Sequence, residues 1–179
     1  PVIIDHSIRT NSSTESKKIK KYSEKLGFKT KIKKIKEKVP ATNIQNWARI
    51  HRRNLLLEEA IKSKSNLILG HHLNDQAETI FMRLSKGSGL QGLVGMKVVN
   101  DWQGIKIIRP LLYFKKKLII QYIYKNKLFH VIDPSNDNVK FERVSTRKLL
   151  KKIDNNIENT FTYNLIRLSK LNKKLFSFL

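Results

Sequence analysis

Short apolar runs alternate with longer amphipathic stretches at the start of the chain. Residues Val2 to Asp5 form an apolar run closed by a carboxylate, which predicts a strand. Ser12-Ser13-Thr14-Glu15 then offers a capping box for a Lys-rich helix that ends at Gly27. From Phe28 to Lys33 apolar or Thr positions alternate with lysines, and this period of two predicts a strand with one solvated face.

The same alternation continues through the middle of the chain. Thr42 or Asn43 can cap a second helix, and the apolar run from Asn66 to Gly70 predicts a buried strand. A further helix is predicted from Asp75 to Lys86, where Gly87 halts it. Four apolar residues mark its inward face: Ala77, Ile80, Phe81 and Leu84.

Two more strands and a helix complete the pattern. Ile105 to Ile108 predicts a strand, Lys115 to Lys127 a helix, and Phe129 to Asp133 a last short strand. Strands that alternate with helices indicate an α/β fold, a mainly parallel sheet wrapped by helices. Such sheets bind ligands at the carboxyl ends of their strands.

The chain becomes helical and polar after this region. Leucines at 165, 168, 171 and 175 form a stripe with no obvious partner. We therefore expect residues 1–147 to form one α/β domain. Residues 148–179 are then a helical linker or the start of a second domain.

Composition narrows the class of protein. With 179 residues, 40% of them hydrophobic and 28% charged, the chain has the composition of a folded domain. It has no cysteine, which excludes disulfides, Cys-ligated zinc or iron–sulfur clusters, and thiolate chemistry. No apolar run approaches the roughly 20 residues that a membrane span needs, so we expect a cytoplasmic protein that is not inserted in a membrane.

The charge balance points to a polyanionic partner. Lys and Arg number 37 against 14 acidic residues, a formal charge of +23, which favours nucleic acid or an anionic membrane as partner. Most of these cations are lysines, so AT-biased coding is a second explanation for part of the excess.

The densest group of polar residues follows the predicted buried strand. In the stretch from Gly70 to Thr79, Asp75 and Glu78 are three residues apart and share one helix face, next to His71. Such carboxylates and imidazoles can hold Mg²⁺, bind zinc, or act as acid and base. In the alternative reading, Asp75 only favours the helix dipole and His71 is a core residue.

Two further sets carry candidate chemistry. Asp5, His6 and Arg9 follow the first predicted strand, at the same edge of the sheet. Arg143 and Arg147 lie at i and i+4 on a predicted helix, where they aim two guanidiniums at one anion, although surface salt bridging explains them equally well.

A glycine-rich stretch matches a nucleotide-binding motif in its letters but not in its structural context. Residues 87–92 fit G-x-G-x-x-G, but that word binds a pyrophosphate only between a strand and a helix. Here it follows a helix, so we interpret it as a helix stop.

Five sequence motifs resemble, in their order and spacing, those of the N-terminal catalytic domain of the tRNA(Ile)-lysidine synthetase family, within the PP-loop ATP pyrophosphatases. The motifs are IIDHSIR from Ile3, WARIHRR from Trp47, LGHHLNDQAETIFMRLSKGSGLQGL from Leu69, IIRPLL from Ile107 and DPSNDNVKFERVSTR from Asp133. The resemblance implies a Rossmann-like fold of the adenine nucleotide alpha hydrolase type.

The resemblance also implies an activity. Members use ATP and Mg²⁺ to adenylate the C2 oxygen of the wobble cytidine of tRNA(Ile) with a CAU anticodon, and the ε-amine of free L-lysine then displaces AMP. A basic surface suits such a substrate.

Motif matching carries the family's site residues over to this sequence. The catalytic residues implied are His71, Asp75, Glu78 and Arg143, with Asp75 also a metal ligand. The nucleotide is expected near Asp5, His6 and Arg9, and the RNA near Arg49, Arg52 and Arg147.

The family's phosphate loop, S-G-G-x-D-S, has no counterpart among these residues. We therefore expect the sequence to be a piece of a longer chain, inactive in ATP cleavage alone. The alternatives are a non-catalytic tRNA-binding remnant or another PP-loop tRNA-modifying enzyme. Thiolases of that superfamily need cysteines that the chain lacks. A homodimer is left open.

Overall fold

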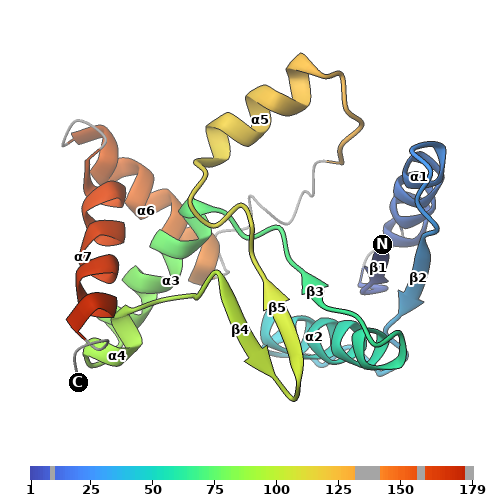
Figure 1. Ribbon diagram of the computed structural model, residues 1–179, viewed down its shortest axis with the longest axis horizontal. Coiled ribbons are helices and arrows are strands. Elements are labelled where there is room, and N and C mark those ends of the chain that lie inside the picture. Colours follow the sequence, from blue (N-terminus) through green and yellow to red (C-terminus); the bar gives the residue numbers. More distant parts are fainter. Residues whose placement is uncertain (9–10, 132–141, 157–159, 176–179) are drawn as a thin grey trace. The chain divides into compact units, whose positions relative to one another are not determined.

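The computed structural model describes residues 1–8, 11–131, 142–156 and 160–175 (Figure 1). The chain divides into two compact units. Unit 1 contains Pro1–Leu67, Gln103–Ile105 and Ile123–Ile132, and unit 2 contains Ile68–Trp102, Lys106–Tyr122 and Asp133–Leu179. Each unit is described by itself. Within the described residues, no helix is both long and apolar enough to pass through a membrane.

Unit 1 is built on a βαβ arrangement. Strand β1 (Val2–Asp5) and strand β2 (Lys31–Lys34) pair in parallel, with Val2 opposite Lys31 and Asp5 opposite Lys34. Helix α1 (Ser12–Lys25) makes the crossover between them, as a parallel pair requires. Helix α2 (Ile44–Lys62) contacts β1 and buries Leu56, Leu57 and Ala60.

The first helix begins differently from its prediction. Asn11 is the N-cap of α1 and makes no capping hydrogen bond with its side chain, so the capping box from Ser12 is not formed. Instead the hydroxyls of Ser12 and Ser13 donate to the carboxylate of Asp5, at 2.7 and 2.6 Å. Because that carboxylate is buried, it needs these donors. The serines therefore stabilise the β1–α1 connection.

The second sheet contains three strands in the order β3-β5-β4. They are β3 (Leu67–Ile68), β4 (Val99–Trp102) and β5 (Ile105–Ile108). Gln103 and Gly104 join β4 to β5 with φ values of 52° and 78°, which is typical of a type I′ hairpin turn. Strand β4 was not predicted, because its sequence Val-Asn-Asp-Trp lacks an apolar alternation.

Three helices of unit 2 pack against α3 (Leu73–Ser85), and Figure 1 shows them beside it. Its partners are α4 (Leu90–Leu93), α6 (Glu142–Asn156) and α7 (Phe161–Leu175). The core between them is apolar and contains Leu73, Ala77, Ile80, Leu93, Leu150, Leu165 and Ile166. Gly87 follows α3 with φ +71°, which confirms the predicted helix stop.

The buried face of α7 is not the predicted leucine stripe. Leu168, Leu171 and Leu175 are exposed, and Leu165 alone of that stripe is buried. Polar anchors determine which face turns inward. The hydroxyl of Thr162 donates to Asp154, at 2.5 Å, and Ser169 donates to the carbonyl of Val94 at 2.7 Å. The division of the chain at residue 147 stays a prediction.

Two other predicted elements differ in their bounds. Helix α5 covers Lys116–Lys125, inside the predicted range. Phe129, His130 and Val131 are not in a strand, and the rest of the strand predicted there lies outside the described residues. This segment is held by aromatic contacts and not by strand pairing. The ring centroids of Phe129 and Tyr22 are 5.4 Å apart, and those of His130 and Tyr124 are 5.5 Å apart.

Candidate active site

A capping box defines the start of α3. His72 is the N-cap, and its Nδ1 accepts a hydrogen bond from the backbone N–H of Asp75 at 3.3 Å. In return the Asp75 carboxylate accepts from the backbone N–H of His72 at 3.0 Å. Lys116 donates its backbone N–H to the side chain of Asn74 at 3.0 Å, which fixes the same turn to the start of α5. The first turn of α3 is therefore held on both sides.

The environment of His72 selects its neutral form. Burial lowers the pKa of His72, although Asp75, with its Oδ2 3.2 Å from Nδ1, acts in the opposite direction. A neutral ring agrees with Nδ1 accepting from the Asp75 N–H, because a protonated Nδ1 has no lone pair to accept with. The ring proton is then assigned to Nε2, which can donate to a ligand.

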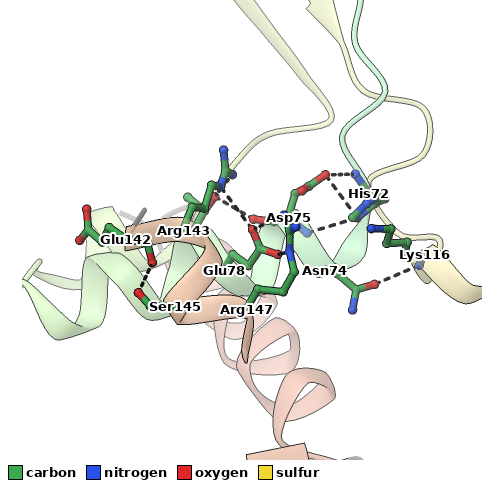
Figure 2. Close-up of polar contacts among 10 residues, drawn as sticks. His72, Asn74, Asp75, Glu78, Lys116, Glu142, Arg143, Ser145 and Arg147 are labelled. Atoms are coloured by element: carbon green, nitrogen blue, oxygen red, sulfur yellow. Dashed lines mark hydrogen bonds and ion pairs between the residues drawn. The ribbon is translucent and has the colours of Figure 1, made fainter. Parts of the chain in front are cut away.

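Glu78 is the centre of the site's charged group. It is 1% exposed, and its two oxygens face two guanidiniums from α6 (Figure 2). Arg147 Nε donates to Oε1 at 2.7 Å, and Arg143 Nε lies 3.3 Å from Oε2. The hydrogen bond from Arg147 to Glu78 raises the pKa of that arginine, which keeps it charged. A second N–H of Arg143 donates to Thr79 Oγ1 at 3.3 Å.

Glu78 does not engage all of the charge and N–H donors of Arg143 and Arg147. Two positive charges face one negative charge, and the side chains of Arg143 and Arg147 keep 35% and 34% of their surface exposed. Each guanidinium has five N–H donors in a planar fork that matches phosphate oxygens. The group can therefore hold an anion with the N–H groups that Glu78 leaves open.

Asp75 offers at most a single ligand to a metal ion. Across the described residues, no three His, Asp or Glu side chains are placed so that they could hold one. Mg²⁺ in nucleotide sites commonly takes one or two carboxylates and fills its shell with phosphate oxygens and water. Asp75 fits this pattern, whereas the donor set does not fit a protein-bound zinc ion.

The remaining candidates lie in unit 1. Burial would raise the pKa of Asp5, but donors from Ser13, Ser12 and the N–H of Ser7, with Lys34 nearby, hold it below its ordinary value. Its carboxylate therefore serves the β1–α1 connection. His6, next along the chain, is half-buried.

Arg49 and Arg52 lie on the exposed side of α2. Arg49 donates to Asn46 at 3.2 Å. Arg9 lies outside the described residues.

The structure thus brings together Asp75 and Glu78 on α3 with Arg143 and Arg147 on α6, while His71, half-buried, comes just before the cap. Asp5, His6, Arg49 and Arg52 belong to the other unit. Their roles stay predictions.

Sequence reasoning missed His72 as the cap of α3. The signal was available, since His72 and Asp75 stand three apart just before an apolar helix, although His is not among the preferred caps. It also missed Thr79, which receives the second N–H of Arg143.

Comparison with known proteins places this arrangement in a family. The family model of the PP-loop domain matches residues 1–153, so the chain belongs to the PP-loop family. The resemblance found from the five sequence motifs is confirmed, because several curated relatives are named tRNA(Ile)-lysidine synthase. That of Zymomonas mobilis is 34% identical over 155 residues, covering 84% of this chain and 47% of the relative.

Two other relatives carry the same name. The protein of the Wolbachia symbiont of Brugia malayi is 36% identical over 85% of this chain, which covers 36% of it. That of Pseudothermotoga lettingae is 34% identical over 89% of this chain, which covers 37% of it. The chain therefore spans about a third to a half of the length of these relatives.

A solved structure confirms the predicted fold class. The U34-tRNA thiolase NcsA from Methanococcus maripaludis, solved with its [4Fe-4S] cluster, superposes with a TM-score of 0.77 over 96% of this chain and 60% of that one. The two are 18% identical, so the likeness shows the fold alone. The α/β fold of the PP-loop type is thereby confirmed.

Proposed function

We propose that the chain is the catalytic domain of a tRNA(Ile)-lysidine synthase, which joins free L-lysine to C2 of the wobble cytidine of tRNA(Ile). The observation that carries the proposal is the Glu78, Arg143 and Arg147 group beside the capped start of α3. These three residues lie in the two longest motifs that the chain shares with the lysidine synthetase family. The names of the curated relatives support the same activity.

The proposed chemistry has two displacement steps. In the first, the C2 oxygen of cytidine attacks the α-phosphorus of ATP and pyrophosphate leaves, which converts a poor leaving group into a phosphate ester. In the second, the uncharged ε-amine of lysine attacks C2, the C2–O bond breaks, and AMP leaves with that oxygen. The amine loses its proton as the new C–N bond forms.

Arg143 and Arg147 supply the electrostatic part of this chemistry. Negative charge shifts onto phosphate oxygens in both steps, and preorganised cations aimed at such oxygens lower the barrier. The N–H groups of the two partly exposed guanidiniums that do not contact Glu78 would bind those oxygens. Glu78 keeps the guanidiniums in place, so they need not reorganise during the reaction.

The start of α3 supplies the remaining groups. Asp75 would be a single carboxylate ligand of Mg²⁺, whose chemistry is to neutralise charge on the phosphates. His71 precedes the cap, and His72, neutral, can donate through Nε2. For the nucleotide, the motif match predicts the segment that carries Asp5, His6 and Arg9, in which the buried Asp5 carboxylate would act by holding the β1–α1 connection.

The charge of the chain fits the proposed RNA partner. With a formal charge of +23, it attracts a tRNA at long range. Arg49 and Arg52, exposed on α2, are assigned to that surface. The substrates place the reaction in the cytoplasm.

A lysine-transfer assay tests the proposal. Because these residues lack the S-G-G-x-D-S loop, the assay uses the protein completed with that loop. It is incubated with ATP, Mg²⁺, radiolabelled lysine and a transcript of tRNA(Ile) with a CAU anticodon, and the nucleosides are identified by mass spectrometry. Lysidine at the wobble position, with one AMP and one pyrophosphate per lysine, is the expected result. A matched tRNA with uridine at that position is the control and should accept no lysine. Tight tRNA binding with no lysine transfer supports the non-catalytic alternative and overturns the proposal.

A further inference from the structure

A second positively charged surface lies on another side of α3, in the same compact unit. A hollow of about 20 Å³ opens between the loop after α4 and helix α7. Gln76 of α3 and Ser169 of α7 form its inner wall. Asp75 and Glu78 lie on a different helix face from Gln76, so this surface is separate from the arginine group.

The loop beside the hollow is held in a single conformation. Met96 donates its N–H to the Gln76 side chain at 2.8 Å, and that side chain donates back to the Met96 carbonyl at 3.0 Å. Arg83 donates to the carbonyl of Gly92 at 2.7 Å. Gly95 has φ +71°, and a Cβ there would lie 2.6 Å from Gln76, so only glycine fits. The loop therefore presents its next residue, Lys97, at a defined position.

Three lysines surround the hollow. Lys97 comes from the loop, and Lys170 and Lys173 come from neighbouring turns of α7. All three are exposed, and within the described residues none is paired with an acidic side chain. The Nζ of Lys170 lies 4.7 Å from the ring centroid of Tyr113, which is 48% exposed. Three unpaired like charges at one place repel one another unless an anion binds.

The size of the hollow indicates which kind of anion fits. About 20 Å³ holds one water-sized group, whereas a small-molecule site usually has several hundred Å³. A nucleotide therefore cannot be enclosed here, and the anion must lie across the surface. The aliphatic lining residues, Val94, Met96 and Ile166, are buried or half-buried, so none can insert into a lipid surface.

We propose that Lys97, Lys170 and Lys173, with the ring of Tyr113, form a contact surface for the phosphate backbone of RNA. Cations along a groove with an exposed aromatic ring are the usual means of binding a nucleic-acid strand without reading its sequence. The choice of RNA rests on the proposed function. This surface then positions the tRNA, whereas the arginine group acts on the reacting nucleotide.

Salt-dependent binding of tRNA tests the inference. Fluorescence anisotropy is measured without ATP or lysine, at several salt concentrations, for wild type and for the triple variant Lys97→Gln, Lys170→Gln, Lys173→Gln. Each lost phosphate contact lowers the magnitude of the slope of log K against log salt by about 0.7 to 0.9, so the slope for the triple variant should be smaller by about 2 to 3. Its affinity at low salt should fall about tenfold or more.

The matched control removes equal charge from unit 1 through Lys17→Gln, Lys18→Gln and Lys21→Gln, all exposed on α1. A smaller change in slope is expected there, and an equal change would overturn the inference. Lysine-to-arginine variants at the three proposed positions should keep wild-type binding, which excludes misfolding as the cause.

A charge-neutral variant and a lipid probe sharpen the test. Tyr113→Leu releases Lys170 without changing the net charge, and about a threefold loss of affinity is expected. Vesicles of phosphatidylserine and phosphatidylcholine should bind all variants equally. Vesicle binding that is lost in the triple variant, with tRNA binding intact, would assign the surface to membranes instead.

The outcomes separate this inference from the proposed function. A triple variant that binds tRNA as wild type does, in a protein that forms lysidine, contradicts the contact surface alone. A triple variant that loses tRNA binding, in a protein that forms no lysidine, supports the surface and contradicts the proposed reaction.

Discussion

Glu59 and Glu78 are both buried carboxylates that face two cations, but their surroundings differ. Glu59, on α2, is bound by Lys31 at 2.5 Å and Lys33 at 2.9 Å, both from strand β2. Glu78 is bound by two arginines from a helix distant in sequence. An ammonium is a compact charge, whereas a guanidinium keeps further N–H groups in fixed directions after it has bound one carboxylate. The lysine group therefore stabilises a unit, and the arginine group can also hold a ligand.

The strongest test of this difference removes each carboxylate charge in turn. Glu78→Gln should lower lysidine formation about a hundredfold, because the arginines lose the charge that orients them. Glu59→Gln should leave the rate within about threefold. Initial rates of lysine transfer measure both, and melting curves confirm that each variant is folded. Equal losses in the two variants would contradict the comparison.

Asp75→Asn provides a second test on the same helix. It removes the proposed Mg²⁺ ligand, and the expected loss is also about a hundredfold. The amide oxygen can still accept the N–H of His72, so the capping box should persist and the melting temperature should change little. A rate close to wild type would return Asp75 to a purely structural role.

Exchange of the cations separates charge from geometry. Arg143→Lys and Arg147→Lys keep the charge and lose the fork, and each should lower the rate about tenfold. Lys33→Arg, in the other group, should leave the rate within about twofold. Should Arg143→Lys behave like wild type, the planar fork has no part in the reaction.

Acid should weaken the lysine group around Glu59. Hydrogen bonds from Lys31 and Lys33 lower the pKa of Glu59 to about 2, from an ordinary value of 4.5. Its contribution to stability is therefore fully present above pH 4.5 and is lost as the pH falls toward 2. Melting temperatures from pH 7 to pH 2 should show wild type and Glu59→Gln converging over that window. A constant difference between them would exclude this ionisation as the cause.

The starts of the two helices give the smallest expected effect. His72 caps α3 with its side chain, whereas Asn43, the N-cap of α2, makes no such bond and has φ 54°. His72→Ala should therefore destabilise the protein by about 1 kcal/mol. Asn43→Gly should cost nothing measurable, since glycine readily adopts positive φ. Urea unfolding measures both.

The order of elements was predictable from the sequence because each depends on local patterns. α3 is the clearest case, with an apolar face, a Gly87 stop and a polar start, and its bounds differ by two residues or fewer from those predicted. The face of α7 was not predictable. Hydrogen bonds from Thr162 to Asp154 and from Ser169 to Val94 decide it, and no periodicity in leucines reports such contacts.

The candidate site was predictable only in part. The i, i+4 spacing of Arg143 and Arg147 showed that they could face one anion, but not that Glu78 would be bound between them. That pairing depends on the packing of α6 on α3, which no local rule supplies. The spacing of His72 and Asp75 was a partial signal for the cap, but it was missed because histidine is not among the usual capping residues.

The separation of Glu78 from Arg147 has a consequence for the order of folding. The two are 69 positions apart, whereas Glu59 and Lys31 are 28 apart. Loop-closure entropy makes the longer connection costlier by about 0.8 kcal/mol, and during synthesis α6 leaves the ribosome long after α3. A nascent chain can thus form the lysine group early, while the arginine group waits for α6. Competence for the reaction is therefore acquired late, after the surrounding helices have docked.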